Sequence, residues 1–218
     1  MTQETAVLEA SELEALLKQV NVRTPSGARN YALLQLMAQT GIRCGEALQV
    51  TAADIRQETW GANGDAVKIT ALRLQRQTTK GKQGREAIPL NPETLAALEV
   101  WQAKRAALGI KGGPLFCTIS AGKRETGFAV TGDLTPGEAL DSRYVRNLVA
   151  RLASKAGIAK RVHPHMLRHT ALTNLYDKTQ DLRLVQTVAG HASSRMTERY
   201  THVHPLAIAA AMGAVPEE

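Results

Sequence analysis

Residues 164–170 read Pro-His-Met-Leu-Arg-His-Thr, and the spacing of their polar side chains is the most informative pattern in the chain. His165 and Arg168 are three residues apart, so on a helix they project to one side. Pro164 stands where a helix would begin, and the dipole at a helix N-terminus favours an anion. The alternative is an ordinary amphipathic helix with a hydrogen-bonded histidine and a surface arginine. Taken alone, so short a motif favours that alternative.

A second arginine, Arg43, stands in a separate part of the chain, directly after Thr40-Gly41-Ile42. Two guanidinium groups can hold both non-bridging oxygens of a phosphate, because the planar fork bonds oxygens in pairs and stays charged. By itself, Arg43 would equally well form an ion pair with Glu46, three residues on. Together with Arg168, it indicates a phosphate site.

Tyr200 is the candidate nucleophile, and it follows His191 by nine residues. A phenol with an ordinary pKa of about 10 reacts poorly at neutral pH unless positive charge and a proton acceptor are close to it. His191 can donate a hydrogen bond to a phosphate oxygen. The whole set fits metal-free cleavage of a DNA phosphodiester through a bond to tyrosine.

The positive charge of the chain is unevenly distributed. The 218 residues carry a formal net charge of +7, yet no acidic residue occurs from Ser142 to Tyr176, and a second acid-free stretch contains Arg73–Arg85. Each stretch also holds a candidate catalytic residue, which favours a surface that follows a nucleic-acid backbone over two solvated basic faces. The DNA contacts expected from these stretches are Arg73, Arg76, Lys82, Arg85, Arg143 and Arg146.

The hydrophobic pattern predicts a mainly α fold with a small antiparallel β-sheet, of the α+β class. Val67–Leu74 alternates apolar and polar residues, and Ala87–Leu90 is a second short run, so we expect a hairpin with a basic, glycine-rich tip. A capping box at Ser11 and Glu14 predicts a short first helix. Further helices are expected at about 26–40, 43–50, 92–108, 141–156, 164–178, 181–189 and 193–200.

The remaining segments complete a single domain over 1–218. Residues 1–10 are expected to be a leader, 118–140 a long exposed loop, and 205–218 an apolar tail that packs on its own domain or on a neighbouring protomer. No apolar run approaches the ~18 residues of a membrane span, so no membrane association is expected. Two distant cysteines, without CxxC spacing, suggest reduced thiols in a cytoplasmic protein.

In their order along the chain, Arg43, Lys80, His165-x-x-Arg168, Gly190-His191 and Tyr200-Thr201-His202-Val203 closely resemble the catalytic domain of the tyrosine recombinases, also called phage integrases. The resemblance runs from about Leu8 to His204. Six positions in the right order are far more specific than any one motif. The resemblance implies the tyrosine recombinase catalytic-domain fold and the cutting and rejoining of DNA at specific sites, in integration, inversion or resolution.

The resemblance also implies a role for each residue. Tyr200 would attack the scissile phosphorus, giving a 3′-phosphotyrosyl link and a free 5′-hydroxyl. Arg43 and Arg168 would stabilise the pentacoordinate transition state. His165 would act as general acid and base, and His191 would donate a hydrogen bond to the phosphate. No cofactor and no metal is expected, because the covalent link conserves the bond energy.

The lysine that would protonate the leaving 5′-oxygen has two candidates. The family usually places it eight residues before the proline of the next strand, whereas Lys80 precedes Pro89 by nine residues and Lys82 by seven. Lys80 is preferred because it follows the strand directly, and Lys82 is the alternative.

The resemblance implies specific double-stranded DNA sites as partners, a homotetramer on DNA, and an accessory DNA-bending protein as a further candidate. Typical members carry an N-terminal DNA-clamping domain, whereas here the catalytic domain begins almost at once. The chain is expected to be either an excised domain or a short recombinase that resembles the fimbrial-switch invertases, which also lack that clamp. No N-terminal core-binding domain is therefore expected. The location expected is cytoplasmic and nucleoid-associated, in a bacterium or encoded by a phage or plasmid.

Two other functions stay open at this point. A catalytically silent DNA-binding accessory protein could keep the fold without the reaction. A metal-dependent hydrolase could use the pairs His163-Pro164-His165 and His202-x-His204. No carboxylate lies near either pair and there is no HExxH, which disfavours the hydrolase.

Overall fold

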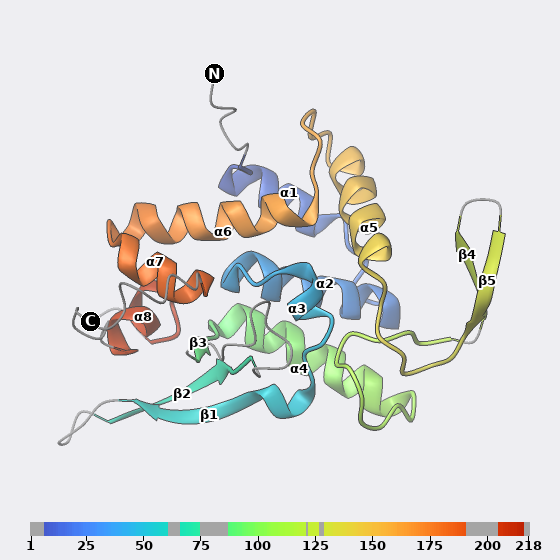
Figure 1. Ribbon diagram of the computed structural model, residues 1–218, viewed down its shortest axis with the longest axis horizontal. Helices are drawn as coiled ribbons and strands as arrows, with labels where there is room; N and C mark the ends of the chain where they lie inside the picture. Colours follow the sequence, from blue (N-terminus) through green and yellow to red (C-terminus); the bar gives the residue numbers. More distant parts are fainter. Residues whose placement is uncertain are drawn as a thin grey trace.

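A computed structural model describes residues 7–60, 66–74, 87–120, 122–126, 129–190 and 205–215. Over these residues the chain is mainly helical with a small antiparallel sheet, as predicted (Figure 1). The elements are α1 (Ala10–Lys18), α2 (Pro25–Thr40), α3 (Cys44–Ala47), the 3-10 turn η1 (Ala52–Asp54), β1 (Ile55–Trp60), β2 (Val67–Leu72), β3 (Ile88–Pro89), α4 (Pro92–Ala107), β4 (Gly122–Thr126), β5 (Ala129–Leu134), α5 (Ser142–Lys155), α6 (Pro164–Thr179), α7 (Leu182–Ala189) and α8 (Pro205–Ala211).

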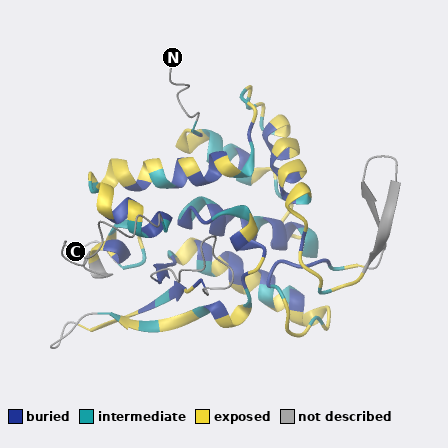
Figure 2. Ribbon diagram, viewed as in Figure 1, coloured by how far each residue is buried: buried dark blue, intermediate teal, exposed yellow. Residues whose placement is uncertain are grey.

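Helix α2 lies at the centre of the core, packed between α4 and α6 (Figure 2). Its N-terminus is set by Thr24, whose side chain accepts a hydrogen bond from the Gly27 N–H at 3.0 Å, and by Pro25 in the first turn. It ends at Gly41, which has a φ of 63°. Because α2 is covered on both sides, its leucines are buried around most of its circumference.

The three-stranded sheet has the order β1-β2-β3, and all its pairs are antiparallel. The predicted pairing of β2 with β3 is confirmed, with Leu72 opposite Ile88. Strand β1 has no counterpart in the sequence prediction. It reads Ile-Arg-Gln-Glu-Thr-Trp and has no buried residue, so an edge strand of this kind lacks the alternation that marks a half-buried strand.

Two expectations for the N-terminal region are wrong. The first helix is opened by Glu9 and Glu12, whose carboxylate accepts the Glu9 N–H at 2.8 Å, and not by a box at Ser11. The leader expected over 1–10 is part of the domain from Val7 onward. Leu8 is buried, and its N–H donates to the hydroxyl of Thr170 at 2.9 Å.

The loop expected over 118–140 contains a two-stranded hairpin, so that prediction is wrong as well. Strands β4 and β5 pair antiparallel, with a register shift between Arg124 and Glu125, and the hairpin extends away from the rest of the chain (Figure 1). A backbone hydrogen bond joins the two segments that lead into the hairpin: the Thr118 N–H donates to Glu138 O at 2.8 Å. The sequence of this segment is rich in glycine and threonine, and such a composition resembles that of a loop.

Helix α8 packs on its own domain, against β3 and α6, and buries Ile208, Ala209 and Met212. Gln39 Nε2 donates to Pro89 O at 2.9 Å and to Met212 O at 3.5 Å, which joins α2 to both elements. Within the single chain the tail therefore packs on its own domain, and its docking on a neighbouring protomer stays a prediction. The helix expected at about 193–200 lies outside the described residues. Among the described helices, none has both the length and the apolarity to cross a membrane.

A buried guanidinium joins α2, α5 and the segment that leads into the hairpin. Arg29 is 4% exposed, and its hydrogen-bond acceptors are neutral oxygens: Asn30 Oδ1 at 2.9 Å, Cys117 O at 2.8 Å and Tyr144 Oη at 2.6 Å. The guanidinium carbon also lies 5.1 Å from the centre of the Tyr144 ring. Burial lowers the pKa of Arg29 from its ordinary value. This network fixes the N-terminal part of α5 to the core.

Candidate active site and nucleic-acid interface

A groove of about 1390 Å³ runs between α3, α5 and the start of α6. Helices α5 and α6 begin at its wall, so the positive ends of their dipoles reinforce the charge of the side chains there. An anion is the ligand that such a surface favours. The charged and polar residues that line it are Arg43, Glu46, Gln49, Ser142, Arg146, Asn147, Lys160, Arg161, His163 and His165.

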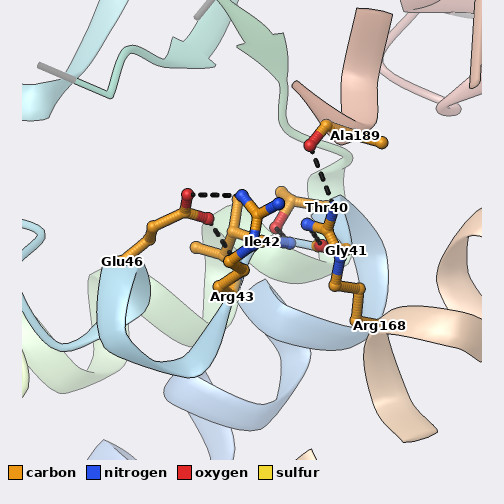
Figure 3. Close-up of polar contacts among 7 residues, drawn as sticks. All are labelled: Thr40, Gly41, Ile42, Arg43, Glu46, Arg168 and Ala189. Carbon is orange, nitrogen blue, oxygen red and sulfur yellow. Dashed lines mark hydrogen bonds and ion pairs between the residues drawn. The ribbon is translucent and has the colours of Figure 1, made fainter. Parts of the chain in front are cut away.

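Arg43 stands at the N-cap of α3, on the groove wall. Its backbone N–H donates to Glu46 Oε2 at 2.7 Å, and its Nη1 donates to Glu46 Oε1 at 3.1 Å (Figure 3). The ion pair offered as an alternative is therefore formed. It does not withdraw Arg43 from the groove, because the Arg43 side chain is 30% exposed whereas Glu46 is 3% exposed. The buried carboxylate fixes the direction of the guanidinium.

Arg168 is 7% exposed and is held by backbone carbonyls from two distant segments. Its Nη1 donates to Gly41 O at 2.6 Å, and its Nη2 donates to Ala189 O at 3.0 Å. Figure 3 shows both arginines beside the Thr40–Ile42 turn. Arg168 thus connects the segment before Arg43 to the end of α7, which the sequence continues into Gly190-His191.

His165 lies on the first turn of α6 and is exposed at the groove. Three positions along a helix leave an offset of about 60° around the axis. His165 therefore lies on the exposed side of α6, whereas Arg168 lies on its buried side. The two side chains do not share one exposed face. The structure brings His165 and Arg43 to the same groove, whereas Arg168 is buried and is not among the residues that line the groove.

Residues 6–206 match the family described as the Phage integrase family. The chain belongs to the phage integrase family. It is similar to tyrosine recombinase XerC of Bacillus subtilis (strain 168), with 32% identity over 197 residues that cover 90% of this chain and 56% of that protein. It is also similar to XerC of Bifidobacterium longum (strain DJO10A), with 33% identity over 190 residues, 85% of this chain and 47% of that one. The chain spans about half the length of the curated relatives it matches.

Solved structures agree with the family assignment. A XerH site-specific recombinase bound to a palindromic difH substrate, in a post-cleavage complex, has a TM-score of 0.64 and 29% identity, over 95% of this chain and 52% of that one. A XerA recombinase has a TM-score of 0.62 over 94% of this chain and 63% of that one, at 23% identity, which is a likeness of fold alone. The fold class expected from the sequence, the integrase catalytic-domain fold, is confirmed.

Half of the predicted site residues of this integrase-family chain lie outside the described residues. The structure therefore places Arg43, His165 and Arg168 of the catalytic set, and Arg73, Arg143 and Arg146 of the expected DNA contacts. The residues outside it are Arg76, Lys80, Lys82, Arg85, His191 and Tyr200.

The described DNA-contact candidates differ in their surroundings. Arg143 and Arg146 are exposed on α5, and Arg146 lines the groove. Arg73 forms a two-pronged ion pair with Glu58, with Nε–Oε1 at 2.8 Å and Nη2–Oε2 at 3.0 Å. A phosphate would have to compete with this carboxylate, so Arg73 is the weakest of the three as a DNA contact.

Sequence reasoning did not assign Asn147, Lys160, Arg161 and His163 to the site, although all four line the groove. Lys160 also donates to Val7 O at 2.9 Å and pairs with Glu12 at 2.7 Å. The sequence offered one indication for Lys160, Arg161 and His163: they directly precede Pro164, at which α6 begins.

Substitution of Gly41 by alanine is expected to destabilise the protein by about 1–2 kcal/mol and to slow any reaction that uses Arg168. A Cβ on Gly41 would lie 3.2 Å from Leu172 Cδ2, and the φ of 63° disfavours any side chain. Urea unfolding measures the stability. Gly45→Ala is the matched control, because a Cβ there meets nothing within 4 Å. Equal stability of the two variants would contradict the strain assigned to Gly41.

Proposed function

We propose that this chain is the catalytic part of a site-specific tyrosine recombinase, which cuts and rejoins DNA strands through a 3′-phosphotyrosyl intermediate. The observation that carries the proposal is the convergence of Arg43 and Arg168 on the Thr40–Ile42 turn beside a cationic groove. Support comes from relatives named tyrosine recombinases and from XerH complexes described as pre-cleavage and post-cleavage.

The reaction begins when the phenolic oxygen of Tyr200 attacks phosphorus and its proton passes to His165. As the new O–P bond forms, the bond from phosphorus to the 5′-oxygen breaks. Arg43 and Arg168 stabilise the extra negative charge of the pentacoordinate transition state, which they meet more strongly than the ground state. His191 donates a hydrogen bond to a phosphate oxygen.

Lys80, with Lys82 as the alternative, donates a proton to the departing 5′-oxygen. The phosphotyrosyl bond keeps the energy of the broken phosphodiester. A 5′-hydroxyl from a second strand can therefore attack it and release Tyr200, with neither ATP nor a metal ion.

The DNA backbone would follow the groove between α3 and α5. Phosphates would pair with Arg143 and Arg146 on α5, and with Arg73, Arg76, Lys82 and Arg85 around the predicted hairpin. Contacts of this kind hold the duplex in register and make affinity fall as salt rises.

The assembly that exchanges strands would be a tetramer on two specific DNA sites, and an accessory DNA-bending protein is a candidate partner. The reaction would take place at the nucleoid, in the cytoplasm of a bacterium. Integration, inversion and resolution all follow from the same chemistry, and the DNA site decides among them.

Covalent trapping tests the function. Nicked suicide duplexes, cut from the DNA that flanks the encoding gene, are incubated with the protein in EDTA, and protein–DNA adducts that resist denaturation are counted. The wild-type chain is expected to form an adduct, and Tyr200→Phe is expected to form none. Tyr176→Phe is the matched control, because Tyr176 is an exposed tyrosine on α6, away from the groove lining.

The rival function has its own outcome in the same experiment. Wild-type protein that binds these duplexes but forms no Tyr200-dependent adduct on any of them would establish a catalytically silent DNA-binding protein. An adduct that EDTA abolishes would contradict the metal-free mechanism.

A further inference from the structure

The helix that carries His165 and Arg168 begins at an unusual N-cap, His163. The backbone of His163 is extended, with φ −147° and ψ 164°, and Pro164 follows in the first turn. Its Nδ1 accepts a hydrogen bond from the Met166 N–H at 3.2 Å, and its own carbonyl accepts from the same N–H at 2.9 Å. Shared N–H groups are common at helix ends, and the usual side chains in this position are Ser, Thr, Asp and Asn.

This cap depends on the protonation state of the ring. Nδ1 can accept the Met166 N–H only while it carries no proton, so the imidazolium form of His163 cannot cap the helix. Serine or asparagine in the same position would cap α6 at any pH. A histidine therefore makes the first turn of α6 sensitive to pH.

The groups that face His163 are mainly cationic. Burial lowers the pKa of His163 from its ordinary value, and His165, Arg161 and His169 lower it further, in that order. The ring also lines the groove with Arg43 and Glu46 of α3, Arg146 of α5, and Lys160. Glu46 is already engaged by Arg43. The surroundings of the groove therefore favour the neutral form of His163.

We propose that His163 is a positioning residue for strand cleavage: its neutral ring caps α6 and holds the first turn, which presents His165 at the groove and leads to Arg168. The proposal rests on the proposed function, in which His165 and Arg168 act on the reacting atoms and His163 acts only through them. The ring centroids of His163 and His165 are 6.4 Å apart in an edge-on arrangement, so the cap lies next to the ring that it would position.

The direction of the pH dependence follows from the lowered pKa. The unfolded chain binds the proton near the ordinary value of 6.5, before the folded chain does. The contribution of His163 to stability is therefore complete above that pH, and it is lost as the pH falls through the lower folded pKa. The rate of DNA cleavage should therefore fall over the same pH interval, because the first turn of α6 loses its cap.

The first test uses the DNA-free protein and compares wild type, His163→Asn and His163→Ala. Asparagine keeps an acceptor that does not titrate, and alanine removes it. At pH 8, His163→Ala is expected to lower Tm by roughly 2–4 °C, with His163→Asn close to wild type. As the pH falls below 6.5, the Tm of wild type should move toward that of His163→Ala. The Met166 amide resonance should follow this titration in wild type and lose that component in His163→Asn.

The second test measures the rate of adduct formation on the nicked duplexes against pH. His163→Ala is expected to be slower by roughly 10- to 100-fold at pH 8, as for a small misplacement of catalytic groups. His163→Asn should form the adduct at the wild-type rate at pH 8. As the pH falls, its rate should decrease less than that of wild type.

The two tests fail in different ways. If wild type forms no adduct, the proposed function fails, while Tm and the Met166 resonance still decide whether His163 caps α6. If His163→Ala has the wild-type Tm at pH 8, or cleaves DNA at the wild-type rate, His163 is not a positioning residue. An acid limb that is identical in His163→Asn would also overturn the proposal.

Discussion

Replacement of Arg168 by lysine is expected to lower the rate of DNA cleavage by about 10²- to 10³-fold, although the positive charge is kept. In the structure one planar guanidinium bonds both Gly41 O and Ala189 O. A lysine ammonium is a point charge without the rigid fork, so it cannot keep this geometry and also meet a transition-state oxygen. The loss should therefore appear in the chemical step and much less in DNA affinity.

Single-turnover cleavage and DNA binding, measured on the same nicked duplex, separate these two effects. Arg183→Lys is the matched control, because Arg183 is exposed on the adjacent helix α7 and is not part of the groove lining. Cleavage by Arg168→Lys at the rate of this control would remove Arg168 from the catalytic set.

Replacement of Arg29 by methionine is expected to destabilise the fold by about 3 kcal/mol, a large fraction of the stability of an ordinary domain. Methionine keeps much of the side-chain volume but removes the donors to Asn30, Cys117 and Tyr144. The Cys117 carbonyl belongs to a fully buried residue, so the loss of its donor is costly. Urea unfolding gives the free energy.

Arg23→Met provides the control for Arg29, since Arg23 is exposed in the turn between α1 and α2. It should unfold within about 0.5 kcal/mol of wild type. A loss below 1 kcal/mol in Arg29→Met would show that α5 is held mainly by its apolar face.

The helices were predictable wherever a cap coincided with an apolar stripe. Asn91 and Pro92 open α4, and Gly41 closes α2, as expected from the sequence. The failures have a common cause. Strand β1 has no buried residue, and the sequence of the β4–β5 segment is rich in glycine and threonine, so neither shows the apolar alternation that reveals strands.

The roles of the predicted site residues stay predictions, and the sequence did not indicate how the described ones are connected. Arg43 was expected either to bind phosphate or to pair with Glu46, and the structure has the pair on the wall of the groove. The partners of Arg168 are backbone carbonyls, which every residue possesses, so no sequence pattern could mark them. His163 was read only as half of a possible metal pair. The sequence predicted that a helix begins at Pro164, but it did not indicate that the His163 ring would cap that helix.

The most direct test of the recombinase mechanism is to identify the residue that carries the DNA. The trapped adduct is digested with protease and nuclease, and the modified peptide is sequenced by mass spectrometry. The predicted result is a nucleotide joined through its 3′-phosphate to the hydroxyl of Tyr200. A nucleotide on any other residue, or a link through a 5′-phosphate, would contradict it.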